Sequence, residues 1–177
     1  VAYGNLGIVM QTRGDLDCAE ALHGTALAIA EPLVRLEGMA NKYGNLGIVM
    51  QTRGDLNGAE AMYKKALAIE EKLERLHGTA SEYGNLGNVM KARGDLDGAE
   101  AMYKNSLAIN EKLGRLEGMA SDYCDLGNVM QTRGDLDGAE AMYKNAMAIE
   151  EKLGRLEGMA SAYGNLVGVM QTRGDLN

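Results

Sequence analysis

Apolar residues recur along the chain with a helical period. In the middle of the sequence, Tyr83, Leu86, Val89 and Met90 fall at positions i, i+3, i+6 and i+7. This spacing places the four side chains on one face of a helix with 3.6 residues per turn. After a short polar segment a second apolar series follows, and it consists of Ala99, Met102, Tyr103, Ser106, Leu107, Ile109 and Leu113. The pattern predicts two amphipathic helices in this part of the chain.

The same pair of helices is predicted several times over. Tyr3, Tyr43, Tyr83, Tyr123 and Tyr163 recur every 40 residues in nearly identical surroundings. Periods of this size are typical of solenoids, in which each unit buries its apolar face against its neighbours. We therefore expect an all-α fold, an α-solenoid of antiparallel helix pairs that forms one array over residues 1–177. The expected units are residues 1–37, 38–77, 78–117 and 118–157, followed by an unpaired helix at 158–177.

Glycine and aspartate mark the predicted helix ends. We expect the first helix of a pair to stop at Gly94. The second helix is expected to open at Asp97, because Glu100 follows it at the spacing of a capping box. Gly47 lies inside a first helix, where a glycine costs up to about 1 kcal/mol relative to alanine. Its predicted role is to let the partner helix approach closely, opposite Ala59.

The helix pair resembles the tetratricopeptide repeat (TPR) over the whole chain. The matching residues of the third unit are Tyr83, Leu86, Gly87, Met90, Gly94, Ala99 and Tyr103. The usual unit of that family has about 34 residues, and the longer unit found here is similar to the Leu-Gly-Asn repeat adaptor proteins and related bacterial arrays. The resemblance implies a right-handed superhelix whose concave wall is lined by the first helices. It also implies a protein or peptide partner.

Composition argues against several other functions. The formal net charge is −7, whereas nucleic-acid binding requires clustered lysine and arginine, so no nucleic-acid partner is expected. The two histidines, His23 and His77, have no partnered nucleophile, and the sequence shows no metal-ligand cluster or phosphate loop. We therefore expect no enzymatic activity, no cofactor and no metal site.

Localisation is predicted from cysteine usage and hydropathy. Cys18 and Cys124 occupy different repeat positions, so we interpret them as free thiols in a reducing, cytoplasmic compartment. The sequence has no apolar run of about 18 residues, and no membrane association is expected. Because the chain begins at Val1 and ends at Asn177 inside the repeat, we interpret it as a fragment of a longer protein.

A second stripe on the predicted first helices is almost uncharged. In the second unit it comprises Asn41, Gly44, Asn45, Ile48, Gln51 and Thr52, and in the third unit Ser81, Gly84, Asn85, Asn88, Lys91 and Ala92. One explanation is packing between neighbouring first helices. The other is ligand contact, because an amide side chain offers one acceptor and two donors that can bracket the main chain of an extended peptide.

The candidate peptide-binding groove is built from this stripe. Its predicted residues are Asn5, Asn45, Asn85, Asp125, Asn165, Asn88, Asn128, Gln51, Lys91 and Gln131. Hydrogen bonding between neighbouring helices remains the alternative role for the asparagines. A further series consists of Arg13, Arg53, Arg93, Arg133 and Arg173. These arginines are explained by the helix dipole, with an acidic partner at the groove rim as the alternative.

The two ends of the array suggest a competing function. Solenoids usually carry polar caps, but the first and last predicted helices present apolar residues without cover. Val167 also stands at the repeat position that Gly47 occupies in the second unit. The alternative to a peptide-binding scaffold is therefore a self-assembling homo-oligomer that associates through its terminal helices.

Overall fold

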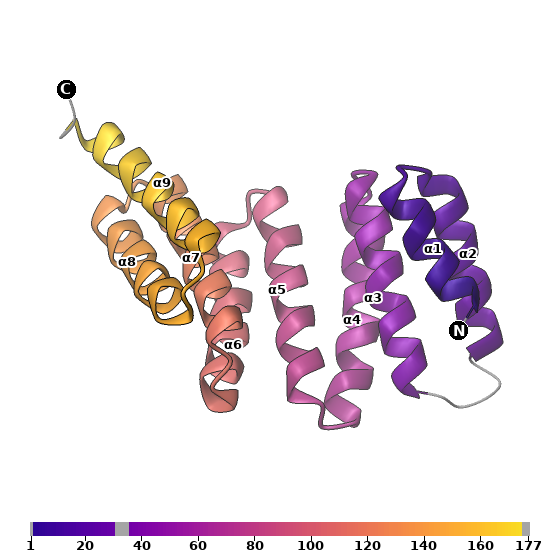
Figure 1. Ribbon diagram of the computed structural model, residues 1–177. Helices are drawn as coiled ribbons and strands as arrows, with labels where there is room; N and C mark the ends of the chain where they lie inside the picture. Colours follow the sequence, from indigo (N-terminus) through magenta and orange to yellow (C-terminus); the bar gives the residue numbers. More distant parts are fainter. Residues whose placement is uncertain (1, 31–35, 175–177) are drawn as a thin grey trace. The chain divides into compact units, whose positions relative to one another are not determined.

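The computed structural model describes residues 2–30 and 36–174. These residues form nine helices and no strand (Figure 1). The helices are α1 (Ala2–Thr12), α2 (Leu16–Ala30), α3 (Leu36–Thr52), α4 (Leu56–Lys72), α5 (Leu76–Ala92), α6 (Leu96–Leu113), α7 (Leu116–Arg133), α8 (Leu136–Leu153) and α9 (Leu156–Arg173). The prediction of an all-α fold is confirmed.

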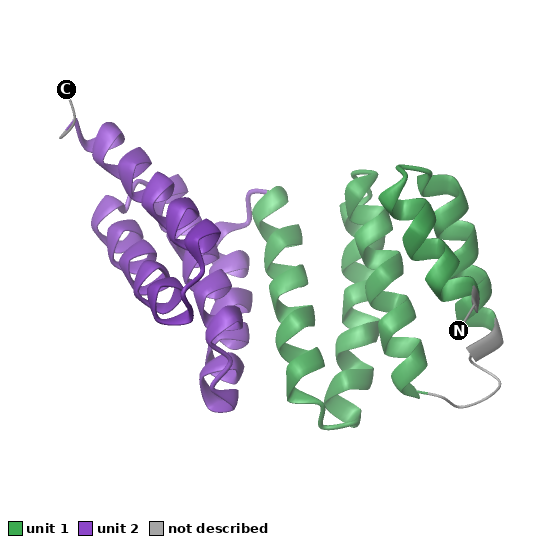
Figure 2. Ribbon diagram, in the orientation of Figure 1, with its two compact units in different colours: residues 1–93 green, residues 94–177 purple. Residues whose placement is uncertain are grey.

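Two compact units make up the chain. Unit 1 covers residues 1–93 and unit 2 covers residues 94–177 (Figure 2). Helices α1 to α5 pack in sequence order within unit 1, as do α6 to α9 within unit 2. Each unit is described by itself below, and the single array with the unit boundaries expected from the sequence stays a prediction.

Each second helix is capped by an aspartate two residues before the predicted start. The N-cap of α6 is Asp95, whose carboxylate accepts a hydrogen bond from the Gly98 backbone N–H at 2.9 Å. The prediction that the helix opens at Asp97 was wrong. Gly94 has a φ of +79° and turns the chain directly after Arg93, so that α6 begins at Leu96 and Asp97 lies in its first turn.

A tyrosine and a glycine bring α3 and α4 together in unit 1. A Cβ atom added at Gly47 would lie 2.5 Å from Cε1 of Tyr63, which is closer than real side chains pack. Tyr63 is fully buried, and its hydroxyl donates a hydrogen bond to Oε1 of Gln51 at 2.8 Å. The expected close approach is therefore present at Gly47, and the nearest atoms opposite it belong to the Tyr63 ring rather than to Ala59.

The same arrangement recurs in unit 2. A Cβ atom at Gly127 would lie 2.5 Å from Cε1 of Tyr143. The Tyr143 hydroxyl donates to Oδ1 of Asn128 at 2.8 Å and to Oε1 of Gln131 at 2.9 Å. The next helix then completes the core, which contains Ala139, Tyr143, Leu166 and Val169. Tyr63 and Tyr143 thus each have a glycine beside the ring and an amide oxygen for the hydroxyl.

The apolar face predicted for α6 is correct except near its C-terminal end. Ala99, Tyr103 and Ser106 are buried, but Leu113 is 40% exposed. Asn110, which the pattern did not include, is 3% exposed and donates a hydrogen bond to Asp122. The last turn of α6 therefore buries the amide of Asn110, which donates a hydrogen bond to the Asp122 carboxylate on α7.

Four of the five repeated arginines form ion pairs with the preceding second helix, and these are Arg53, Arg93, Arg133 and Arg173. In unit 1, Arg53 at the end of α3 pairs with Asp17 and Glu20 near the start of α2. In unit 2, Arg133 pairs in the same way with Asp97 and Glu100. Pairs at such exposed positions contribute at most about 1 kcal/mol each. The arginines therefore have acidic partners inside the chain, in addition to any favourable interaction with the helix dipole.

Candidate functional site

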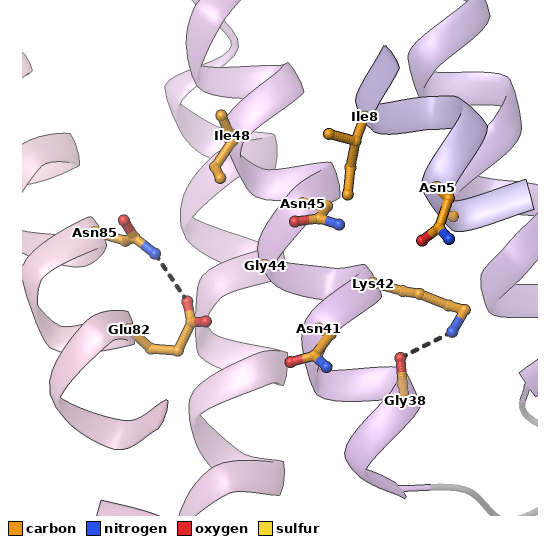
Figure 3. A pocket seen from close by; sticks show the side chains of 11 residues that line it. Asn5, Ile8, Gly38, Asn41, Lys42, Gly44, Asn45, Ile48, Glu82 and Asn85 are labelled. Carbon is orange, nitrogen blue, oxygen red and sulfur yellow. Dashed lines mark hydrogen bonds between the residues drawn. The ribbon is translucent and has the colours of Figure 1, made fainter. Parts of the chain in front are cut away.

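Three first helices of unit 1 enclose a cavity of about 500 Å³. The residues that line it come from α1, α3 and the middle of α5 (Figure 3). The lining residues are Gly4, Asn5, Ile8, Gly38, Asn41, Lys42, Gly44, Asn45, Ile48, Glu82 and Asn85. We call this cavity the unit 1 groove.

Asparagines from successive repeats meet in the unit 1 groove. Asn5, Asn45 and Asn85 occupy the same repeat position and come from α1, α3 and α5. The side chains of Asn5, Asn41 and Asn45 form no hydrogen bond with any residue that the structure describes. Asn85 donates a hydrogen bond from Nδ2 to Oε2 of Glu82 at 3.2 Å. Most of the amide groups in the groove are thus available to a ligand.

Two isoleucines supply an apolar part of the same groove. Ile8 is 48% exposed and Ile48 is 39% exposed, although both are large aliphatic side chains. Figure 3 shows Ile8 on α1 and Ile48 on α3, with Glu82 on the same side of Asn45 as Ile48. Exposed apolar side chains that line a cavity beside free amides are typical of a binding surface.

Two charged residues also line the unit 1 groove. Lys42 donates a hydrogen bond from Nζ to the backbone oxygen of Gly38 at 3.1 Å. Glu82 is 8% exposed, and burial raises the pKa of its carboxyl group to about 7. The hydrogen bond from Asn85 lowers this pKa and the negative charge of Glu70 raises it, but burial is the larger effect.

Several of the predicted groove residues lie elsewhere. Gln51 is on α3, while Asn88 and Lys91 are on α5, and none of these three lines the unit 1 groove. Asp125, Asn128 and Gln131 on α7 and Asn165 on α9 belong to unit 2. The amide oxygens of Gln51, Asn128 and Gln131 accept hydrogen bonds from buried tyrosines. These oxygens stabilise the packing of helix pairs, and ligand contact stays a prediction for every residue of the predicted groove.

Sequence reasoning missed the charged residues of the groove, although a signal for them exists. One repeat position on the first helices is occupied in turn by Ala2, Lys42, Glu82, Asp122 and Ala162. In an array whose units are nearly identical, a position that changes from apolar to cationic to anionic marks a place where the surroundings differ between units. That variation could have identified Lys42 and Glu82 as candidate site residues from the sequence.

Residues 2–30 and 36–174 contain neither a cluster of metal-binding side chains nor a membrane-spanning helix. In these segments no group of three or more His, Cys, Asp or Glu side chains is arranged to hold a metal ion. No helix in the same segments is both long and apolar enough to cross a membrane.

Comparison with known proteins identified one family model and a set of similar structures. The family model, described as the MalT-like TPR region, matches residues 8–177. Among curated proteins no sequence match was found. The crystal structure of BtubC (BKLC) from P. vanneervenii superposes with a TM-score of 0.86 at 26% identity, covering 96% of this chain and 71% of that one.

Two further structures share the fold at lower identity. A Podosopora anserina putative kinesin light chain with nearly identical TPR-like repeats has a TM-score of 0.81 at 21% identity, covering 99% of this chain and 87% of that chain. The apo form of RapI has a TM-score of 0.88 at 15% identity, covering 98% of this chain and 63% of RapI. All three are similar to this chain over nearly its whole length.

Proposed function

Because the chain belongs to the family of MalT-like tetratricopeptide repeat regions, we propose that it is an interaction scaffold whose unit 1 groove holds an extended segment of a partner protein. TPR-like repeats generally serve as protein-interaction scaffolds and typically have no catalytic activity. The observation that carries the proposal is the groove itself, where Asn5 and Asn45 present amides that no described residue pairs, beside the exposed Ile8 and Ile48.

The chemistry of the groove suits the main chain of an extended segment. Such a segment presents an unpaired N–H and C=O group at each residue, and an asparagine side chain can satisfy both kinds of group. The isoleucines then add apolar contact area without requiring a particular sequence. In unit 2 the repeat position of Asn45 is occupied by Asp125 and Asn165. We propose the same kind of contact at Asn165, whereas the Asp125 carboxylate would only accept from main-chain N–H groups.

Replacing both Asn5 and Asn45 by alanine tests the proposal. Neither side chain is hydrogen-bonded to a described residue, so the helical content should stay unchanged. Each lost hydrogen bond to a ligand weakens binding by about 1 kcal/mol, and the pair by roughly 30-fold. The measurement is retention of a pooled library of random-sequence decapeptides on the immobilised protein.

A matched control replaces Asn105 and Asn145, which are exposed on the second helices α6 and α8. This variant removes the same number of amides outside the groove and should retain the library like the original chain. Equal retention by the Asn5/Asn45 and the Asn105/Asn145 variants would contradict the proposal, as would a library that the original chain does not retain at all.

A second candidate function is self-assembly, which the exposed apolar residues of α1 and α9 favour. Leu6 is 45% exposed although its counterpart Leu86 is 2% exposed, and Val9 is 43% exposed although Val89 is fully buried. On α9, Leu156 and Tyr163 are exposed by 78% and 64%. Apolar side chains at this density are typical of surfaces that become covered, and a second copy of the chain presents the same surfaces.

Sizing the protein across a dilution series tests self-assembly. We expect an apparent mass above that of the monomer. This mass should fall on dilution, because a lower concentration shifts the equilibrium from associated copies to separate chains. Replacing Leu156 by glutamine and Tyr163 by serine should shift the equilibrium to monomer. Replacing Leu113, which is exposed on α6, by glutamine serves as the control. A monomer at every concentration would rule the candidate out.

A further inference from the structure

We propose that Glu82 makes the unit 1 groove selective for segments in which a lysine or arginine lies close to an aliphatic side chain. The inference rests on the proposed function, because it specifies the partner that the same groove accepts. Charge complementarity supports it, since the chain carries a formal net charge of −7 and the groove places the Glu82 carboxylate beside Asn85, away from Lys42, which is directed toward Asn5 (Figure 3).

The carboxylate of Glu82 is directed into the groove by its surroundings. One oxygen, Oε2, accepts the hydrogen bond from Asn85 at 3.2 Å. The other, Oε1, lies where a Cβ atom at Gly44 would be only 3.0 Å away. The glycine of α3 therefore leaves room for this oxygen, and both Gly44 and Glu82 line the cavity (Figure 3).

Comparison with the equivalent acid of unit 2 shows what Glu82 lacks. Asp122 occupies the same repeat position and accepts hydrogen bonds from Oγ of Ser106 at 3.1 Å and from Nδ2 of Asn110 at 2.7 Å. Both donors belong to α6, so the acid of unit 2 is satisfied within the helix packing. This acid is therefore explained by structure alone.

The helix α4 of unit 1 carries no such donors at the two equivalent positions. Ala66 stands at the repeat position of Ser106, and Glu70 stands at that of Asn110. Two donors are thereby replaced by a methyl group and a second carboxylate. Asn85, which itself lines the groove, is the hydrogen-bond donor that the described part of unit 1 supplies to Glu82. A cationic group from a ligand would supply the hydrogen-bond donors that α4 does not offer to Glu82.

Among the described residues, no lysine or arginine forms an ion pair with the Glu82 carboxylate. From α4, Glu70 adds negative charge to the surroundings of Glu82, although Glu70 has an ion pair of its own with Nε of Arg75 at 3.3 Å. From α3, Lys42 lines the same groove and donates to Gly38. A ligand cation should therefore bind more tightly as pH rises from 6 to 8, because Glu82, whose pKa is about 7, ionises over that interval.

The aliphatic requirement comes from Ile8 and Ile48. They line the same groove as Glu82 and remain substantially exposed. A leucine, isoleucine or valine side chain of the partner would cover both of them and remove apolar surface from water. The preferred segment therefore combines an aliphatic residue with a basic one, while the asparagines hold its main chain.

A peptide-selection experiment on the intact chain tests the inference. The immobilised protein is mixed with a pooled library of random-sequence decapeptides, and the retained peptides are sequenced at pH 6 and pH 8. The original chain should retain lysine- and arginine-containing peptides about tenfold better than peptides with glutamine at the same place. In the Glu82→Gln variant this preference should disappear, while peptides without a basic residue are retained as before.

The controls separate this inference from the proposed function. Glu151→Gln changes the net charge equally at an exposed position on α8 and should keep the preference. Glu82→Ala provides a second test, because Ala162 shows that alanine is compatible with this repeat position. Retention of peptides without any preference for basic residues, or with a preference that survives both Glu82 variants, would overturn the inference alone. Failure to retain any peptide would overturn the proposed function as well.

Discussion

Replacing Gly47 by valine should lower the free energy of unfolding by about 3 kcal/mol. The added Cβ atom would lie 2.5 Å from Cε1, 2.7 Å from Cδ1 and 2.9 Å from Cζ of Tyr63. The ring is fully buried and its hydroxyl is held by Gln51, so it cannot move aside without losing that hydrogen bond. The measurement is urea unfolding followed by circular dichroism.

The same substitution at Gly164 is the matched control. Gly164 also lies inside a first helix, but an added Cβ atom would meet nothing within 4 Å. Valine should therefore change the stability there by no more than about 0.5 kcal/mol. Val167 of α9, at the repeat position of Gly47, already shows that valine is compatible with the helix itself. Equal losses at Gly47 and Gly164 would show that the Tyr63 contact is not the cause.

Replacing His23 by tyrosine should raise the free energy of unfolding by about 2 kcal/mol. His23 stands where the other repeats have Tyr63, Tyr103 and Tyr143. It is fully buried, and neither ring nitrogen has a hydrogen-bond partner in the described residues. A tyrosine hydroxyl would reach the repeat position of Gln51, which is occupied here by Gln11, and would remove the unsatisfied nitrogens from the core.

The stabilising effect of this substitution should grow on acidification. Burial, and to a lesser extent the charge of Lys42, lowers the pKa of His23 below its ordinary value of 6.5. The unfolded chain then binds more protons than the folded one as pH falls through 6.5, and the original chain loses stability. The tyrosine variant has no such group at this position.

Urea unfolding of both proteins at pH 7.5 and pH 5 measures the difference. Substitution of His77, which is exposed on α5, by tyrosine is the control and should leave the stability and its pH dependence nearly unchanged. A His23→Tyr variant that is less stable than the original chain at both values would show that the cavity around His23 cannot hold the larger ring.

The fold was largely predictable because its causes are local or repeated. Leu86 and Val89 are buried as their helical spacing predicted, and Gly94 adopts the positive φ expected after a helix end. The start of α6 was misplaced at Asp97 because two aspartates, two residues apart, both suit a cap in sequence. Only the turn geometry selects Asp95, whose carboxylate reaches the Gly98 N–H.

The candidate site was predictable only in part. The alignment of Asn5, Asn45 and Asn85 follows from the repeat and from the helical period, and the structure brings these three together. Gln51 and Gln131 belong to the same predicted stripe, yet their oxygens accept hydrogen bonds from Tyr63 and Tyr143. A stripe on one helix does not show which of its members the partner helix uses.

By itself, the sequence determined that the chain is helical, where most helices end, and which apolar face each helix buries. These properties depend on helical spacing and on glycine and aspartate at the turns, and both act over a few residues. Tertiary structure decided which polar side chains are hydrogen-bonded within the helix packing and which line the groove. Asp122 is satisfied by Ser106 and Asn110, whereas Glu82 faces the groove. That difference arises because hydrogen-bond donors come from a neighbouring helix, whose residues are distant in sequence and differ from one repeat to the next.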